Sequence, residues 1–208
     1  MSNVFVSAGI SLDGYIAGPN GGPETPLGEG GLEIHNWMFK QQSFLRHLGL
    51  EGGETNNKDS DIIDGIFNRT GTTIIGKRMF EEGEANWPEE APFRTPVFVL
   101  THEKREPWER KGGTTFYFVN DGIHGALEQA KQVAGDKDIR IGGGADVIRQ
   151  YLHAGLVEEL ELHIAPLILG RGVRLFDQAD ASKFSLEIVD ATNSVDVTHV
   201  MYRVKPSH

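Results

Sequence analysis

The stretch that most restricts the fold of this chain runs from Ile139 to Leu152 and reads IRIGGGADVIRQYL. Its short β-branched run ends at three consecutive glycines, and an amphipathic pattern follows at once, which predicts a strand, a turn and a helix. Such a turn leaves backbone N–H groups without partners, and without a Cβ in the way an anion can approach them closely. On this stretch alone, a phosphate-binding turn and a tight connection without a ligand both remain open.

A second junction between a strand and a helix has similar features. The β-branched run 72–75 ends at Gly76, and Lys77 and Arg78 supply cations before a helix that contains Phe80. Arginine can hold a phosphate through two hydrogen bonds and can stack on a planar base. Solvated basic residues at a strand end are the simpler interpretation of one such junction. Two of them in one sheet favour a dinucleotide lying across the carboxyl ends of the strands.

The order of the expected elements predicts an α/β fold in one domain, residues 1–208. Strands alternate with helices through most of the chain and then follow one another alone, which predicts a mixed, mostly parallel sheet with helices on both faces and an antiparallel C-terminal edge. Strands are expected at residues 4–10, 72–75, 96–101, 114–119, 139–141, 157–164, 185–189 and 197–204, and helical patterns at 32–50, 59–67, 123–134 and 145–152.

Two of these elements carry more specific expectations. Alternation of acidic and apolar residues in the strand 157–164 predicts one solvent-exposed face, on which His163 would be half-buried. The helix 123–134 should bury a stripe that includes Val133. The glycine- and proline-rich loop 18–31 is long enough to act as a lid.

Composition excludes several functions. The formal net charge of -10 argues against a general nucleic-acid surface, which requires a basic footprint. The chain contains no cysteine, so disulfides, thiolate catalysis and cysteine-ligated zinc are excluded. The histidines are scattered without an i, i+4 pair, so no metal site is expected. The N-terminus has no signal-peptide pattern and no apolar run has membrane-spanning length, so a cytoplasmic location is expected.

Four motifs together resemble the dihydrofolate reductase-like superfamily: SLDGYIAGP, IIGKRMFEEG, IGGGADVIRQYL and HIAPLILGRGVRLF. The chain is most similar to stand-alone relatives of the riboflavin-biosynthesis reductase domain, the RibD C-terminal domain. The motifs occur in the family's order and cover nearly the whole chain. The resemblance implies a three-layer dihydrofolate reductase-like fold, NADPH as cofactor, and reduction of a small pterin-like or riboflavin-precursor-like heterocycle.

The resemblance also implies which residues contact NADPH. The nicotinamide would be bordered by Ala8, Ile16 and Ala17. The adenosine-side phosphates would be held by Gly76, Lys77, Arg78 and Met79, and the 2′-phosphate and adenine by Thr101 and His102. The pyrophosphate would be cradled by Gly142, Gly143, Gly144, Ala145, Asp146 and Val147.

The substrate side is less defined. True dihydrofolate reductases carry a pterin-binding carboxylate on the helix before the IIGKR-type strand, where this chain has Asp59, Asp61 and Asp64. We take Asp61 as the candidate, although acids at a helix start are also explained by the helix dipole. No cysteine is present for the zinc deaminase domain that often precedes the riboflavin enzyme.

Three further residues have two interpretations each. Asp13 could orient substrate or water, or simply belong to an Asp-Gly turn. Trp37 could form the floor of a substrate pocket, or be a core aromatic. Arg171 could bind an anionic group of the substrate, or be a surface charge on a loop.

The function predicted first is an NADPH-dependent reductase without an assigned catalytic residue. A ligand-binding protein that kept the fold but lost turnover, and a true dihydrofolate reductase, remain alternatives. The strand 157–164 and the C-terminal pair are expected to offer an edge for a second subunit, which predicts a homodimer.

Overall fold

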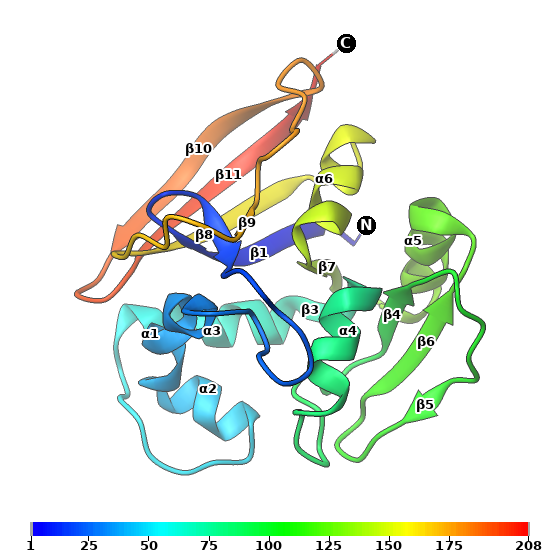
Figure 1. The fold of residues 1–208 in the computed structure, drawn as a ribbon, viewed down its shortest axis with the longest axis horizontal. Helices are drawn as coiled ribbons and strands as arrows, with labels where there is room; N and C mark the ends of the chain where they lie inside the picture. Colours follow the sequence, from blue (N-terminus) through cyan, green and yellow to red (C-terminus); the bar gives the residue numbers. More distant parts are fainter. Residues whose placement is uncertain (1, 208) are drawn as a thin grey trace.

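The computed structural model describes residues 2–207 and is built around a nine-stranded sheet (Figure 1). The strand order is β10-β11-β8-β1-β7-β3-β4-β6-β5, and β2 pairs separately with β9. The strands are β1 Val4–Ser11, β2 Tyr15–Ala17, β3 Thr70–Gly76, β4 Val97–Leu100, β5 Trp108–Glu109, β6 Thr115–Val119, β7 Asp138–Gly143, β8 Glu159–Ala165, β9 Val173–Arg174, β10 Phe184–Asn193 and β11 Thr198–Pro206.

The body of the sheet is parallel, as predicted. Strands β8, β1, β7, β3, β4 and β6 pair in parallel, whereas β11 joins β8 antiparallel and β10 closes that edge as the antiparallel partner of β11. The mixed sheet with an antiparallel C-terminal edge is thereby confirmed. Because the parallel strands point the same way, β1, β3, β4 and β7 bring their carboxyl ends to one edge.

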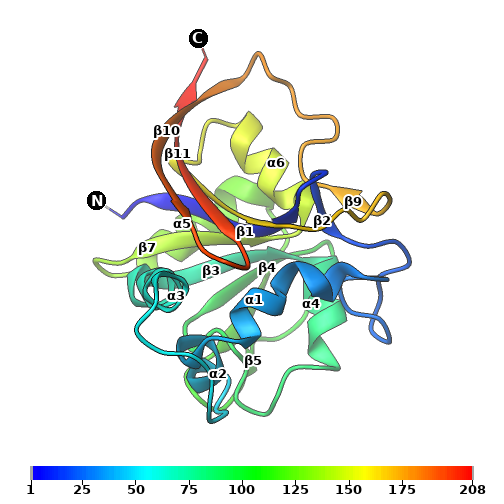
Figure 2. The same cartoon turned by 90° about the vertical axis from the view of Figure 1, so that its left-hand side faces the viewer.

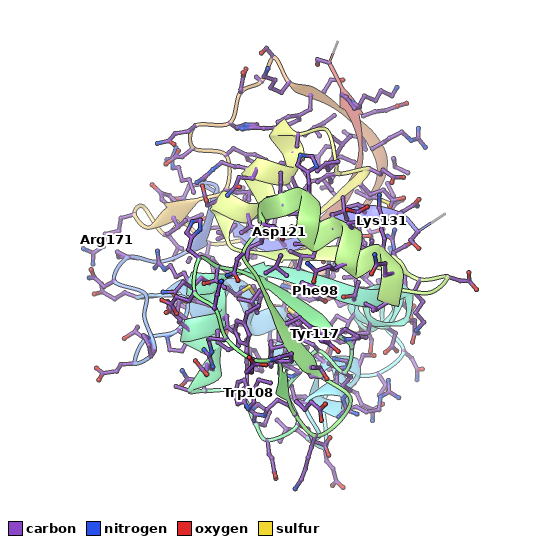
Figure 3. The ribbon with its side chains drawn as sticks, turned by 90° about the vertical axis from the view of Figure 1, so that its right-hand side faces the viewer. Phe98, Trp108, Tyr117, Asp121, Lys131 and Arg171 are labelled. Atoms are coloured by element: carbon purple, nitrogen blue, oxygen red, sulfur yellow. The ribbon has the colours of Figure 1, made fainter. Side chains whose placement is uncertain are left out.

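Helices cover both faces of the sheet and make three layers (Figure 2). They are η1 Gly31–His35, α1 Asn36–Phe39, α2 Gln42–His47, α3 Lys58–Arg69, α4 Lys77–Glu84, α5 Gly122–Val133 and α6 Ala145–His153. Helices α5 and α6 bury the larger apolar core against one face. Figure 3 shows α5 beside the face of β4 and β6 that carries Phe98 and Tyr117, whose rings stack 5.3 Å apart.

The opposite face is covered by η1, α1, α3 and α4 and divides into two parts. Under α4 it is aromatic, where Phe80 packs with Ile75 and Phe116. Under α1 and α3 a small apolar cluster around Trp37 and Ile63 lies beside polar side chains from the strands. The sheet is thus apolar on one face and partly polar on the other, which positions the groups described below.

Several expectations were wrong in detail. The helical pattern at 32–50 is interrupted and forms η1, α1 and α2. Val133 lies at the last turn of α5 and is 48% exposed, because its position faces away from the sheet. Strand β8 does not have a wet face, since Glu161 is buried against Arg69 of α3 and His163 against Trp37 of α1. Nor is β8 an edge, because it lies between β11 and β1.

No helix within residues 2–207 is long and apolar enough to cross a membrane. The one-domain organisation of residues 1–208 stays a prediction.

Candidate functional site

The glycine-rich turn joins β7 to α6 at the carboxyl edge of the sheet. Gly143 has φ +129°, which favours glycine, and the Gly143–Gly144 peptide is cis. Gly144 is the N-cap of α6 and has no side chain to cap the helix. A Cβ built on Gly144 would meet no atom within 4 Å, so the space in front of the α6 N-terminus is open. Free amides, a helix dipole and open space are the requirements of a phosphate site.

The second junction lies directly beside the first, because β3 pairs with β7. Helix α4 begins at Lys77 after Gly76, again without a side-chain cap. A Cβ on Gly76 would lie 2.9 Å from Val147 Cγ2, and one on Gly143 would lie 3.3 Å from Met79 Sδ. The two turns therefore touch, and two helix N-termini open toward the same edge. Their residues fit a pyrophosphate, although neither turn is the dinucleotide fingerprint at the first strand of a doubly wound fold.

The two cations of this edge are engaged by acids. Lys77 Nζ lies 2.7 Å from Glu81 and 3.1 Å from Glu103. Arg78 Nε donates to Glu82 at 2.8 Å, and the Arg78 side chain is 60% exposed. An arriving phosphate would have to compete with these carboxylates, which exposed ion pairs permit because they contribute little.

The other predicted cofactor residues line the same edge. Thr101 follows β4, where its Oγ1 accepts the amide of Glu103 at 3.1 Å, and His102 beside it is exposed. Ala8 lies in β1, and β2 beside it carries Ile16 and Ala17, all three half-buried. The structure thus brings the predicted cofactor residues to one edge, on neighbouring strands.

Asp13 holds two loops together. It accepts hydrogen bonds from Ser11 Oγ at 2.6 Å, from the amide of Leu169 at 3.1 Å and from the amide of Gly170 at 2.7 Å. Desolvation alone would raise the pKa of Asp13, but these hydrogen bonds lower it below its ordinary value. The geometry favours a turn-forming role for this carboxylate.

The loop 18–31 is fastened to α4. The amide of Leu27 donates to Glu82 Oε2 at 3.1 Å, and Asn86 Nδ2 donates to the carbonyl of Pro23 at 2.7 Å. Arg171, on the loop after β8, pairs with Glu29 at 2.9 Å and is 73% exposed. Arg171 therefore joins two loops at the surface.

A buried chain of polar side chains crosses the face beneath α1 and α3. Ser7 Oγ lies 2.9 Å from His163 Nε2, and His163 Nδ1 lies 2.8 Å from His199 Nδ1. His199 Nε2 lies 3.1 Å from Asp59 Oδ1, while Asp59 Oδ2 accepts from Ser194 Oγ at 3.0 Å. The four residues from Ser7 to Asp59 are no more than 5% exposed. Both oxygens of the buried carboxylate are thereby occupied.

Burial favours the neutral form of both histidines in this polar network. For His163, burial acts first, and interaction with His199 and with the charge of Arg140 also keeps its pKa well below the usual range. Burial also lowers the pKa of His199, against the hydrogen bond to Asp59, which raises it. With Asp59 as acceptor, every hydrogen can point one way: Ser7 to His163, His163 to His199, and His199 to Asp59.

The predicted substrate residues are not brought together. Asp61 is exposed on α3, and the buried carboxylate of that helix is Asp59, two residues earlier. Trp37 is 2% exposed and packs against His163 and His199 at ring distances of 5.3 and 4.9 Å, which is a core position.

A pocket of about 460 Å³ lies where α2 and α3 meet the segment before β4. His47 and Phe67 line it and stack 3.6 Å apart in nearly parallel planes. Its other lining residues are polar: Ser43, Arg46, Asp64, Asn68 and Arg94. Of these residues, only Asp64 was among the three acids considered from the sequence as a pterin-binding carboxylate.

Sequence reasoning also missed the polar chain. Its signal was present in ELELHI, residues 159–164, whose polar side chains share one face of β8. That alternation was interpreted as a solvent boundary, whereas here it marks a buried polar layer.

Comparison with known proteins places the chain in a family. The family model described as the RibD C-terminal domain matches residues 2–200. The chain belongs to the RibD C-terminal domain family. It is 28% identical to the uncharacterized protein YyaP of Bacillus subtilis (strain 168), over 96% of this chain and 93% of that protein.

Solved structures share the fold. A protein from Shewanella sp. PV-4, assigned by name to riboflavin biosynthesis, superposes with a TM-score of 0.64 at 20% identity, covering 99% of each chain. Dihydrofolate reductase from Enterococcus faecalis, complexed with NADP(H) and RAB-propyl, gives 0.55 at 12% identity, covering 98% of this chain and 96% of that one. The dihydrofolate reductase-like fold is confirmed, and the family supports oxidoreductase chemistry in general.

Proposed function

We propose that this RibD C-terminal family member is an NADPH-dependent reductase of a small heterocycle, pterin-like or of the 5-amino-6-(5-phosphoribosylamino)uracil type. The observation that carries the proposal is the pair of adjacent, uncapped helix N-termini at the starts of α4 and α6. Backbone amides in this arrangement suit a pyrophosphate. The Enterococcus dihydrofolate reductase, which has the same fold, was solved with NADP(H).

Residues of this chain would bind NADPH and orient it. Amides of residues 144–147 and 77–79 would hold the phosphates, and the ends of β1 and β2 would border the nicotinamide. NADPH, when bound, supplies the hydride. The loop 18–31, fastened to α4, would exclude water from that edge. No side chain is assigned as proton donor, and Asp13 is a weak candidate because its oxygens are already hydrogen-bonded.

Two alternatives make different predictions. A binding protein without turnover would bind NADPH but reduce no acceptor. A true dihydrofolate reductase needs a carboxylate free to hold the pterin, whereas Asp59 is occupied by His199 and Ser194 and Asp61 faces solvent. This occupancy favours the reductase of another heterocycle. Steady oxidation of NADPH with a pterin, a flavin precursor or a quinone would separate turnover from binding.

Arg78→Ala tests the cofactor and its preference. If Arg78 contacts the 2′-phosphate, the substitution lowers NADPH affinity about tenfold, equivalent to about 1.4 kcal/mol, and leaves NADH affinity unchanged. Titration calorimetry of both nucleotides measures the effect, with the exposed Arg203→Ala as control. Absence of binding of either nucleotide to the unaltered protein would remove the reductase function.

We also propose a cytoplasmic homodimer. The edge strand β10 exposes Leu186, Ile188 and Val189 at 40%, 65% and 48%, and its side away from β11 has no partner strand, so a second copy could cover it. Light scattering at micromolar concentration should give twice the chain mass, and Ile188→Lys should halve it. A monomeric mass for the unaltered protein would contradict this assembly.

A further inference from the structure

On the polar face of the sheet beneath α1 and α3, some side chains already have hydrogen-bond partners and others do not. Ser7, His163, His199 and Asp59 satisfy one another in a chain, so neither imidazole has a free nitrogen. A ligand reaching this face would find no free ring nitrogen on these residues, and both oxygens of Asp59 already accept a hydrogen bond.

Arg140 is a charged residue on this face whose guanidinium has no ion-pair partner. It lies in the middle of β7, paired with Phe5 of β1 and Thr73 of β3, so its partial exposure must come from its side chain. Its Nε is buried without a partner, and its Nη2 reaches only the carbonyl of Ser7, at 3.3 Å. Within residues 2–207 no carboxylate lies within 4 Å of this guanidinium.

The acid whose charge acts on Arg140 does not pair with it. Glu161 faces the same layer from β8, but its Oε1 is taken by Arg69 at 2.8 Å, and its Oε2 is buried without a partner. Arg69 also binds Asp138 and Glu159, so each of its three nitrogens has a carboxylate and Arg140 takes no part in this network. An unpaired guanidinium with a buried Nε is destabilising unless an acceptor arrives from elsewhere.

A second polar side chain on this face also lacks a partner. His35 lies so close to β1 that a Cβ on Gly9 would be 2.7 Å from its Cε1, and its imidazole makes no hydrogen bond to residues 2–207. Burial, and then the charge of Arg140, lower the pKa of His35 to about 4. Arg140 Nε and the His35 ring are therefore two groups on this face of the sheet without a protein partner.

We propose that Arg140 is a specificity-determining residue that donates hydrogen bonds to oxo oxygens on the inward edge of a planar heterocyclic substrate. This inference rests on the reductase function proposed above. A guanidinium offers only donors, so it suits an edge of acceptors and rejects an edge of amino groups. Asp59 already accepts from His199 and Ser194, and the free oxygen of Glu161 is buried, whereas Arg140 is partly exposed, so a substrate edge meets the guanidinium donors first.

Two pteridines of the same ring size test the proposal: pteridine-2,4-dione, with oxo groups, and 2,4-diaminopteridine, with amino groups. Each is titrated calorimetrically into the protein with NADP⁺ present, so that no hydride is transferred. The dione should bind at least tenfold more tightly than the diamine. Arg140→Met should lower the affinity for the dione at least tenfold and leave NADPH affinity unchanged, whereas the exposed Arg203→Met should change neither.

Arg140→Lys keeps the charge but loses the planar fork, and should weaken dione binding several-fold; it decides the matter if the methionine variant does not fold. Equal binding of the two pteridines, tighter binding of the diamine, binding of neither, or unchanged dione affinity in the Arg140 variants would overturn the proposal. The last outcome would indicate a buried water between Arg140 and Glu161. If dione binding depends on Arg140 but the protein does not bind NADPH, the result contradicts the proposed reductase function and leaves the role of Arg140 intact.

Discussion

Gly144→Ala is expected to lower NADPH affinity at least tenfold, or about 1.4 kcal/mol, while leaving the thermal unfolding midpoint within about 2 °C of the unaltered protein. Gly144 has φ -76° and ψ -165°, which an alanine adopts readily, and its Cβ would meet no protein atom within 4 Å. The added methyl group therefore costs the fold little. It would occupy the space through which a phosphate must approach the first amides of α6.

The control is a glycine whose Cβ is equally unobstructed but lies away from this edge. Gly65, within α3, fits, since nothing lies within 4 Å of its Cβ. Gly65→Ala should leave NADPH affinity unchanged and raise helix stability slightly. Equal NADPH affinities for the two variants, measured by calorimetry, would mean that the pyrophosphate does not lie at the α6 N-terminus.

The parts of the fold that the sequence predicted are those governed by local pattern. β-Branched runs ended by glycine, as at Gly76 and Gly142, identify buried strands and their turns without knowledge of the neighbours. The number and order of strands then restrict the sheet to a mixed, mostly parallel arrangement. The segment 32–50 was harder to predict, because its helical pattern breaks at Lys40 and Gly49 and because short helices depend on tertiary packing.

Strand position and the nature of each face could not be predicted in the same way. The alternation in residues 159–164 shows that the two faces of β8 differ, but not that helices cover the polar one. The position of β8 between β11 and β1 depends on pairing with residues far apart in sequence, which no local pattern encodes. This is why His163 was expected to be half-buried and is instead enclosed.

The same contrast between local sequence pattern and long-range packing applies to the candidate site. The proposed cofactor edge was predictable because each turn is one continuous segment, and the turns at Gly76 and Gly142 meet once their strands pair. The proposed substrate side was not, since Arg140 lies in a strand without a motif. Asp61 stays a prediction, but the structure places it in solvent, whereas Asp59, two residues earlier, lies on the buried face of α3.

Acidification from pH 7 to pH 4 is expected to remove several kcal/mol of stability through buried histidines. The pKa of His35 and that of His47 are each lowered from 6.5 to about 4, chiefly by burial, and those of His163 and His199 are lowered as well. The unfolded chain therefore binds these protons at a higher pH than the folded chain. Stability is complete above pH 6.5 and falls as the pH decreases through this window.

The shift of His35 alone corresponds to about 3 kcal/mol at pH 4, and His47, which solvent screens more, contributes less. Urea unfolding midpoints between pH 7.5 and 4 measure the slope. His35→Gln should reduce this slope by about the contribution of one histidine, whereas the exposed His124→Gln should leave it unchanged. Exposed carboxylates such as Asp180 and Glu187 have pKa values lowered from 3.8 and 4.5, so their contribution is lost mainly below pH 4.5, at the acid end of this range.

A stability that stays constant from pH 6.5 to 4.5 would have a wider consequence. It would mean that the buried imidazoles accept protons within the folded protein, and the one-way chain from Ser7 to Asp59 requires neutral His163 and His199. A protonated pair would offer donors of its own to a ligand, so Arg140 would no longer be the single cation facing this layer. The pH profile therefore tests the electrostatic basis of the substrate preference as well as the stability of the fold.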